Sequence, residues 1–247
     1  MSLNILLDQN YQFLAKPLEN IKNIFSQSTN SIHKARNELK TTHLVDTDLV
    51  IKSFKIPHLF NKIVYTFFRK SKAYRSFHNA QKLILKGINT PQPIALLEFY
   101  KANLLNESYY VAEEFKYDFT IREALLHQVE DTQNIFKAFA EFTHKVHKAD
   151  IWHKDYSPGN ILIKKEGDNY IFSIVDINRM DFIRISEYDG LENFNKLWAD
   201  EADLEIMAKV YAKLEGIDEK KAIQLIIKHD KINKRIKNFK KKLKFKK

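Results

Sequence analysis

Four residues in this sequence have the types and the order that phosphoryl transfer requires. Lys52 and Asp176 each follow a run of β-branched residues, and Asp155 and Asn160 stand five residues apart in one polar loop. Phosphoryl transfer needs little covalent chemistry and much positioning, because a base, metal ligands and a cation must be placed around the phosphates. The set therefore indicates a phosphotransferase site.

Each of these residues has an expected role. Asp155 is the expected base for an acceptor hydroxyl, and Asn160 and Asp176 are the expected ligands of Mg²⁺. Lys52 is expected to hold the α- and β-phosphates of ATP. Val50 lies on the same side of its predicted strand and is expected to line the adenine slot. The order of these residues predicts a protein-kinase-like fold.

The glycine-rich phosphate loop of protein kinases is absent, because no glycine precedes Gly87. We expect residues 30–37 to replace it, with Lys34 or Arg36 contacting phosphate directly. The expected nucleotide-binding set also includes Glu113 and Phe115.

The helical glutamate that pairs with the strand lysine in protein kinases is absent as well. No acidic residue occurs between Asp48 and Glu98. Either His78, Asn79 or Gln81 substitutes for it, or an acid arrives from elsewhere in the chain. A third possibility is a non-catalytic pseudokinase that only binds its ligands.

Several of these residues also have ordinary structural explanations. Lys52 could be a strand lysine whose stem covers apolar surface, and Asp176 could cap a turn. The histidines His144, His147 and His153 suggest a metal site, but the first two follow helical spacing on a polar face, so zinc is disfavoured. His153 is expected to brace the loop that contains Asp155.

The first 115 residues are predicted to form a lobe rich in antiparallel strands, in which the first thirty residues form an arm or irregular strands. Its elements are a hairpin over 37–54 turning at 46–48, helices over 59–86 with a break near 69–71, and strands at 94–99 and 109–113 joined around Asn106. Gly87 stands where a glycine would end the second helix. The apolar residues expected to pack in the core here are Phe60, Ile63, Phe67 and Phe68.

Residues 116–227 are predicted to form a mainly helical lobe, which makes the fold α+β and two-lobed. Its elements are a core helix capped by Asp131 or Thr132, with apolar residues including Phe142, strands at 161–164 and 170–176, and helices from residue 191 separated by Gly216.

Residues 228–247 are predicted to form a basic amphipathic tail. They hold eleven Lys or Arg against one acid, which gives 11 − 1 = +10, the whole net charge of the chain. The rest of the chain, residues 1–227, is formally neutral. Ile232, Ile236, Phe239 and Leu243 share one helical face, so we expect the tail to bind an anionic membrane surface. The alternatives are a solvated lysine-rich end and nucleic-acid binding, which the neutral body disfavours.

The composition excludes other classes of protein. With 44% apolar residues the chain can bury a core, and with no cysteine it has no disulfide and no thiolate metal site. Because no apolar run is long enough to span a membrane and no signal peptide is recognisable, we expect a soluble, cytoplasmic protein.

The loop sequences distinguish this chain from protein kinases that act on peptides. The D-F-G motif is replaced by Asp176-Ile177-Asn178, and no proline follows Pro158 to form A-P-E. Only 92 residues follow Asp155, which leaves little room for a peptide-binding subdomain. A small-molecule or glycan acceptor is therefore favoured.

Over roughly residues 30–215 the sequence resembles the lipopolysaccharide kinases that phosphorylate Kdo or heptose, in particular the shorter Bacteroidetes-like members. The resemblance rests on the segments 32–37, 50–55, 64–73, 87–94, 153–160 and 175–179. It implies ATP-dependent phosphorylation of a sugar hydroxyl on a lipid-anchored glycan, at the cytoplasmic face of the inner membrane. Aminoglycoside and choline phosphotransferases share the catalytic loop, so a small-molecule acceptor stays open.

Overall fold

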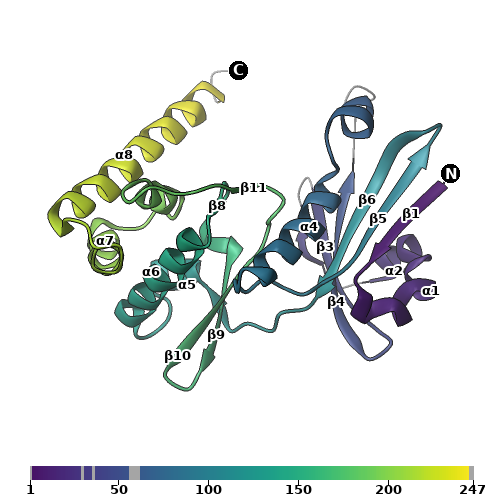
Figure 1. Cartoon of the computed structure of the whole chain (residues 1–247), viewed down its shortest axis with the longest axis horizontal. Helices are drawn as coiled ribbons and strands as arrows, with labels where there is room; N and C mark the ends of the chain where they lie inside the picture. The colour runs from purple at the N-terminus through teal and green to yellow at the C-terminus, as the bar shows by residue number, and fades with distance from the viewer. Residues whose placement is uncertain (1, 29–30, 35–36, 56–61, 245–247) are drawn as a thin grey trace. The chain divides into compact units, whose positions relative to one another are not determined.

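The computed structural model describes residues 2–28, 31–34, 37–55 and 62–244. The chain forms two compact units, Met1–Phe115 and Lys116–Lys247 (Figure 1). Each unit has its own sheet and its own buried core, and each is described in turn.

The first unit is built on a six-stranded antiparallel sheet with the order β1-β5-β6-β4-β3-β2. The strands are β1 (Ser2–Leu7), β2 (Ser31–Lys34), β3 (Asn37–Leu44), β4 (Thr47–Lys55), β5 (Pro93–Lys101) and β6 (Leu104–Glu113). The N-terminal residues, predicted to be an arm or irregular strands, form a regular edge strand on β5 followed by short helices.

Helices cover both faces of this sheet (Figure 1). They are η1 (Gln9–Leu14), α1 (Ala15–Leu18), α2 (Ile21–Gln27), the π-helical turn η2 (Val64–Phe68) and α4 (Lys72–Leu85). Leu14, Leu18 and Ile21 pack in one core cluster with Leu49 and Ile51 of β4. Because side chains alternate along a strand, Val50 and Lys52 lie on the opposite face, where α4 packs on β5 and β6.

The predicted hairpins are confirmed, but both turns lie at other positions. β3 and β4 are joined by Val45-Asp46, and β5 and β6 by Ala102-Asn103, all four with positive φ. Two-residue hairpin loops with positive φ at both positions match the twist of the strands, and Asp and Asn tolerate this conformation well. The predicted turn residue Asn106 lies inside β6 instead.

The predicted helical segment with a break near 69–71 is confirmed, and Gly87, with φ of 71°, follows α4 as expected. The expected core packing of its apolar residues is wrong for those that are described. Ile63 is 39%, Phe67 67% and Phe68 81% exposed. Phe60 lies outside the described residues.

The second unit is mainly helical, with a three-stranded sheet of order β10-β9-β7 and a two-stranded sheet of β11 and β8. Its elements are β7 (Phe119–Thr120), α5 (Ile121–Leu125), α6 (Thr132–Lys148), β8 (Ile151–His153), η3 (Pro158–Asn160), β9 (Ile161–Glu166), β10 (Asn169–Ile174), β11 (Met180–Phe182), η4 (Asp189–Lys196), α7 (Glu201–Glu215) and α8 (Glu219–Lys244).

Helix α6 begins at the predicted residue, but its cap and its buried face differ from the prediction. Asp131 occupies the N-cap position without a side-chain cap bond, because its carboxylate accepts from Asn134 and Tyr170 instead. Phe142 is only half-buried. His147, predicted on a polar face, is 4% exposed.

Helix α8 runs unbroken through the predicted start of the tail at residue 228. Asp230 is buried, and the side chains of Asn233 and Lys234 donate hydrogen bonds to the backbone carbonyls of Asn195 and Ala199 at 2.7 and 2.8 Å. Residues 235–242 are all exposed. The packed part of α8 thus ends near Lys234. No helix in the described part of the chain has the length and hydropathy that crossing a membrane requires.

Candidate active site

Asp155 lies in the loop between β8 and η3, which is anchored on both sides by buried residues. On one side is His153, and on the other is Tyr156, both fully buried. The Tyr156 hydroxyl lies 3.0 Å from the hydroxyl of Thr143 in α6, and its ring stacks on Phe139 with centroids 5.7 Å apart. Asp155 itself is half-buried. Its backbone is therefore fixed while its carboxylate stays accessible.

The imidazole of His153 makes two hydrogen bonds with backbone groups. Nδ1 accepts from the Asp155 N–H and Nε2 donates to the Val175 carbonyl, both at 3.0 Å. Because an N–H can only donate and a carbonyl can only accept, the ring must be neutral with its proton on Nε2. Burial lowers the pKa of His153 and favours the same form. The predicted bracing role of His153 is confirmed.

A second buried histidine extends this network to two more helices. His147 accepts from the Tyr211 hydroxyl at Nδ1 (2.9 Å) and donates from Nε2 to the side-chain oxygen of Asn193 (3.1 Å). The Asn193 amide in turn donates to the His153 carbonyl at 3.0 Å. Burial lowers the pKa of His147 to about 4. Helices α6 and α7 and η4 thus support the catalytic loop through one polar chain.

Asn160 and Asp176, the expected magnesium ligands, lie at the ends of paired strands. The Val175 N–H donates to the Asn160 carbonyl at 2.9 Å. The Asn160 amide nitrogen donates to the Asp155 carbonyl at 2.8 Å, which leaves its side-chain oxygen to face a ligand. Asp176 has φ of 55°, an unfavourable conformation for a non-glycine residue, and its Oδ1 accepts from Asn178 at 2.6 Å. An amide and a carboxylate oxygen fit Mg²⁺.

A group of cations lies around the catalytic loop. Arg179 donates to the Asp155 carboxylate, and the ammonium of Lys196 donates to the Lys154 carbonyl. Burial lowers the pKa of Lys196; the Asp155 charge opposes this, and the charges of Arg179 and Lys237 add to it. Arg179 could have been found from its place three residues after the metal aspartate. Nothing in the sequence pattern pointed to Lys196 or Lys237.

The predicted nucleotide-binding residues Val50 and Lys52 lie on the α4 face of the first unit's sheet. Tyr110 of β6 lies directly opposite Lys52. Its hydroxyl is buried and makes no hydrogen bond with any residue that the structure describes. An apolar strand surface with a cation and an unused hydroxyl fits a nucleotide.

Glu98 is a candidate for the acid that is expected to come from elsewhere in the chain. Lys52 pairs with Tyr110, which pairs with Leu96, and Glu98 follows two residues later on β5. Glu98 therefore lies on the same face as Lys52, and it is 7% exposed. Its carboxylate accepts from the Tyr100 hydroxyl at 3.0 Å. An acid brought from elsewhere in the chain is thus compatible with the fold.

The other predicted nucleotide-binding residues are less close to this face. Glu113 pairs with Leu49, so its side chain lies on the opposite face, where its carboxylate accepts from the Tyr11 hydroxyl at 2.5 Å. Any nucleotide contact of Glu113 must come from its backbone. Phe115 ends the first unit. Arg36 and the side chain of Lys34 lie outside the described residues.

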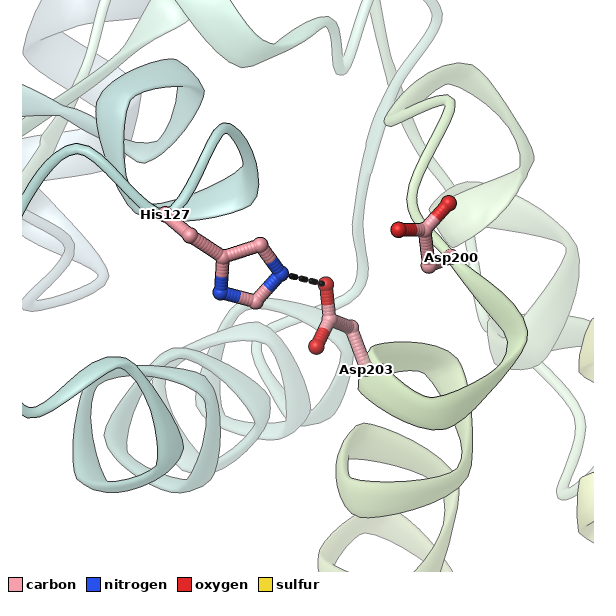
Figure 2. Close-up of side chains that lie close together, drawn as sticks. All are labelled: His127, Asp200 and Asp203. Atoms are coloured by element: carbon pink, nitrogen blue, oxygen red, sulfur yellow. Dashed lines mark ion pairs between the residues drawn. The ribbon is translucent and has the colours of Figure 1, made fainter.

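The histidines of α6 have other partners: His144 pairs with Glu215 at 2.8 Å, and His147 belongs to the polar chain. Another cluster, His127 with Asp200 and Asp203, lies where the loop after α5 meets the start of α7. The Nε2 of His127 lies 3.5 Å from Oδ2 of Asp203, and each of the three residues has a ligand atom within 4.8 Å of the others. Figure 2 shows the pair of His127 and Asp203 with Asp200 beside it. We interpret the cluster as an ion pair that joins these two elements.

Comparison with known proteins gives a family match over most of the chain. The model of the "Lipopolysaccharide kinase (Kdo/WaaP) family" matches residues 20–220. A curated relative, the 3-deoxy-D-manno-octulosonic acid kinase of Pasteurella multocida (strain Pm70), is 25% identical over 170 residues, which cover 64% of this chain and 68% of the relative.

A solved structure described as WaaP in complex with acyl carrier protein has the same fold. The match has a TM-score of 0.65 at 12% sequence identity and covers 94% of this chain and 98% of the other. The predicted α+β, two-lobed, kinase-like fold is confirmed.

We predict that the second unit loses stability as the pH falls from about 6.5 toward about 4. The unfolded chain takes up protons on His147 and His153 near pH 6.5, whereas the fold holds both rings neutral, so acid favours unfolding across this window. Each pKa unit of difference is worth about 1.4 kcal/mol. Urea unfolding followed by tryptophan fluorescence measures this, because Trp152 and Trp198, the two tryptophans of the chain, lie in the second unit.

The matched control is His147→Gln, which keeps hydrogen-bonding capacity but removes the titrating ring. This variant should be less stable than wild type at pH 7.5 and should depend less steeply on pH. An unchanged pH slope would show that His147 titrates normally in the fold.

Proposed function

The chain belongs to the lipopolysaccharide kinase (Kdo/WaaP) family, and on that premise we propose that it transfers the γ-phosphate of ATP to a Kdo- or heptose-like sugar hydroxyl of the lipopolysaccharide core. The observation that carries the proposal is the link through His153 between the backbone of Asp155 and the strand that ends at Asp176. One imidazole thus sets the expected base and an expected metal ligand in a fixed relation.

In the proposed reaction Asp155 accepts the proton of the acceptor hydroxyl while that oxygen attacks the γ-phosphorus and ADP leaves. Arg179 engages Oδ2 of Asp155, which leaves Oδ1 for the hydroxyl. Asn160 and Asp176 would hold Mg²⁺, which supplies charge neutralisation at the phosphates when bound. Val50 and Lys52 would hold the nucleotide.

The cations around the catalytic loop support an acidic acceptor. The ammonium of Lys196 interacts with two carboxylates, Asp155 and Glu192, and with two further cations, Arg179 and Lys237, so positive charge is in excess by three groups to two. Such an excess favours a substrate that carries its own negative charge, because partly buried positive charges attract anions strongly. The relative from Pasteurella multocida is named for a sugar acid, which fits this chemistry. We assign Lys196 to the acidic group of the acceptor.

We further propose that the protein works at the inner face of the inner membrane, held there in part by α8. Ile232, Ile236 and Phe239 are 43%, 48% and 64% exposed along one side of the helix, among lysines. In Figure 1 the C-terminal end of α8 projects beyond the rest of its unit. An exposed apolar stripe flanked by cations is typical of helices that lie on anionic bilayers.

Asp155→Asn should lower phosphate transfer by about 10² to 10⁴ while leaving ATP binding intact, because only the base is lost. Asp176→Asn should instead abolish the Mg²⁺ dependence of ATP binding; asparagine tolerates the left-handed backbone there. Labelled ATP with purified lipopolysaccharide, and nucleotide titration with and without Mg²⁺, measure the two effects. Asp168→Asn, in the exposed β9–β10 turn, is the control. Wild-type turnover in Asp155→Asn would show that Asp155 is not the base.

Lys196→Met should raise the KM for the acceptor about tenfold or more and leave the KM for ATP nearly unchanged. Its matched control is Lys209→Met, an exposed lysine paired with Glu205 on α7. Steady-state kinetics with each substrate varied in turn separate the two constants. A rise in the KM for ATP alone would place Lys196 at the nucleotide phosphates instead.

Truncation after Lys234 should weaken binding to anionic vesicles and remove most of its salt dependence, because it deletes eight Lys or Arg (11 − 3 = 8) and no acid. ATP affinity and melting temperature should not change. Truncation after Ile227 is the contrasting variant: it also removes buried Asp230 and two hydrogen bonds to the body, so it should lower the melting temperature. Wild-type vesicle binding after the shorter deletion would contradict a membrane role for α8.

A further inference from the structure

The turn between residues 65 and 70 of the first unit presents two phenylalanines to solvent. Phe67 is 67% exposed and Phe68 is 81% exposed, in the π-helical turn η2 and directly before Arg69 and Lys70. Single exposed apolar residues are common, whereas neighbouring exposed apolar side chains are typical of interaction surfaces. We call residues 65–70 the exposed aromatic turn.

The exposed aromatic turn is held firmly on the sheet. The Thr66 hydroxyl accepts from the Leu105 N–H of β6 at 2.9 Å and donates to the Lys62 carbonyl at 2.6 Å. The Lys62 ammonium donates to the Asn106 side chain at 2.6 Å. The turn closes with a hydrogen bond from the Arg69 N–H to the Val64 carbonyl at 2.8 Å. The phenylalanines are therefore presented by a fixed backbone, which reduces the entropy lost when they are buried.

Cations and tyrosines lie next to the two phenylalanines in the chain. The Arg69 guanidinium lies 5.8 Å from the centroid of the Tyr65 ring, and the Lys70 ammonium lies 4.8 Å from that of Tyr74. Tyrosine rings with cations beside an apolar tip are the composition found at the boundary between lipid headgroups and acyl chains.

The charge of this region is also one-sided. Residues 49–97 contain nine Lys or Arg and no Asp or Glu. Residues 1–227 are formally neutral because this basic segment is balanced by acidic residues elsewhere. The first unit therefore contains a basic segment in addition to the C-terminal tail. Arg69 and Lys70, which are exposed directly after the phenylalanines, can attract anionic lipid headgroups.

We propose that the exposed aromatic turn inserts Phe67 and Phe68 into the interfacial region of an anionic bilayer. This contact in the first unit rests on the membrane location given under the proposed function. It is tested by vesicle binding, which does not depend on catalysis. Single-stranded nucleic acid also binds cations and aromatic rings, but it does so in grooves with stacking platforms, whereas these rings project from a turn.

The first test compares Phe68→Ser with Leu85→Ser, since Leu85 is 85% exposed at the end of α4 and matches Phe68 in exposure. Binding is measured by co-sedimentation with vesicles of equimolar phosphatidylcholine and phosphatidylglycerol. Phe68→Ser should lower the partition coefficient about tenfold, which is ~1.4 kcal/mol, and Leu85→Ser less than about twofold. Equal loss in both variants, or no loss in Phe68→Ser, would overturn the proposal.

A second measurement reports insertion directly. The chain contains no cysteine, so Phe68→Cys and Leu85→Cys each provide a single site for a nitroxide label. With the same vesicles, the label at position 68 should become accessible to oxygen and shielded from a water-soluble relaxation agent, whereas the label at position 85 should stay in water. A label at position 68 that stays in water would overturn the proposal.

Two further readouts separate the possible failures. Turnover of Phe68→Ser on a soluble core-sugar acceptor should equal that of wild type, so loss of vesicle binding with full turnover supports insertion. If Phe68→Ser has wild-type turnover and also wild-type vesicle binding, the insertion proposal is rejected and the kinase proposal stands. Loss of affinity for a single-stranded oligonucleotide in Phe68→Ser, with unchanged vesicle binding, would assign the turn to nucleic acid instead.

Discussion

The two hydrogen bonds of His153 constrain most of the second unit's functional geometry. Both partners are backbone groups, the N–H of Asp155 and the carbonyl of Val175, so neither can exchange its role as donor or acceptor. The ring must stay neutral, and it must stay dry to hold these bonds at full strength. The buried tyrosine, asparagine and second histidine around it supply that environment. The packing around His153 thus keeps its imidazole neutral.

The sequence identified candidates for the site itself more readily than the residues that support it. Asp155, Asn160 and Asp176 were recognisable because their chemistry demands fixed types at short, ordered spacings. His147 and Asn193 were not recognisable, because they reach the loop from segments that no local pattern connects to it. His147 was placed on a polar face for a related reason: a helix that buries a hydrogen-bonded polar chain has the same pattern as one that exposes it.

The same limit applies to the strand-rich unit. Its hairpins and helix break could be predicted from the spacing of apolar residues. Its turns lie at the residue pairs that adopt positive φ, which differ from the predicted positions. The apolar residues near Phe67 and Phe68 were assigned to the core, because periodicity identifies apolar residues without saying which surface covers them. The net charge of residues 1–227 was a poor guide to the charge of its parts. A neutral total concealed a segment with nine cations and no acid, and only charge located along the chain reveals it.

The continuity of α8 has a mechanical consequence. A helix rises about 1.5 Å per residue, so the part from Lys234 to Lys244 extends about 15 Å past its last packed turn. Helix α8 packs on η4, which carries Lys196, so the exposed part of the helix continues a segment that is fixed to the second unit. A flexible tail would leave the orientation of the second unit on a bilayer free. A continuous helix whose exposed stripe lies on the bilayer would instead set one orientation for the loop that contains Asp155.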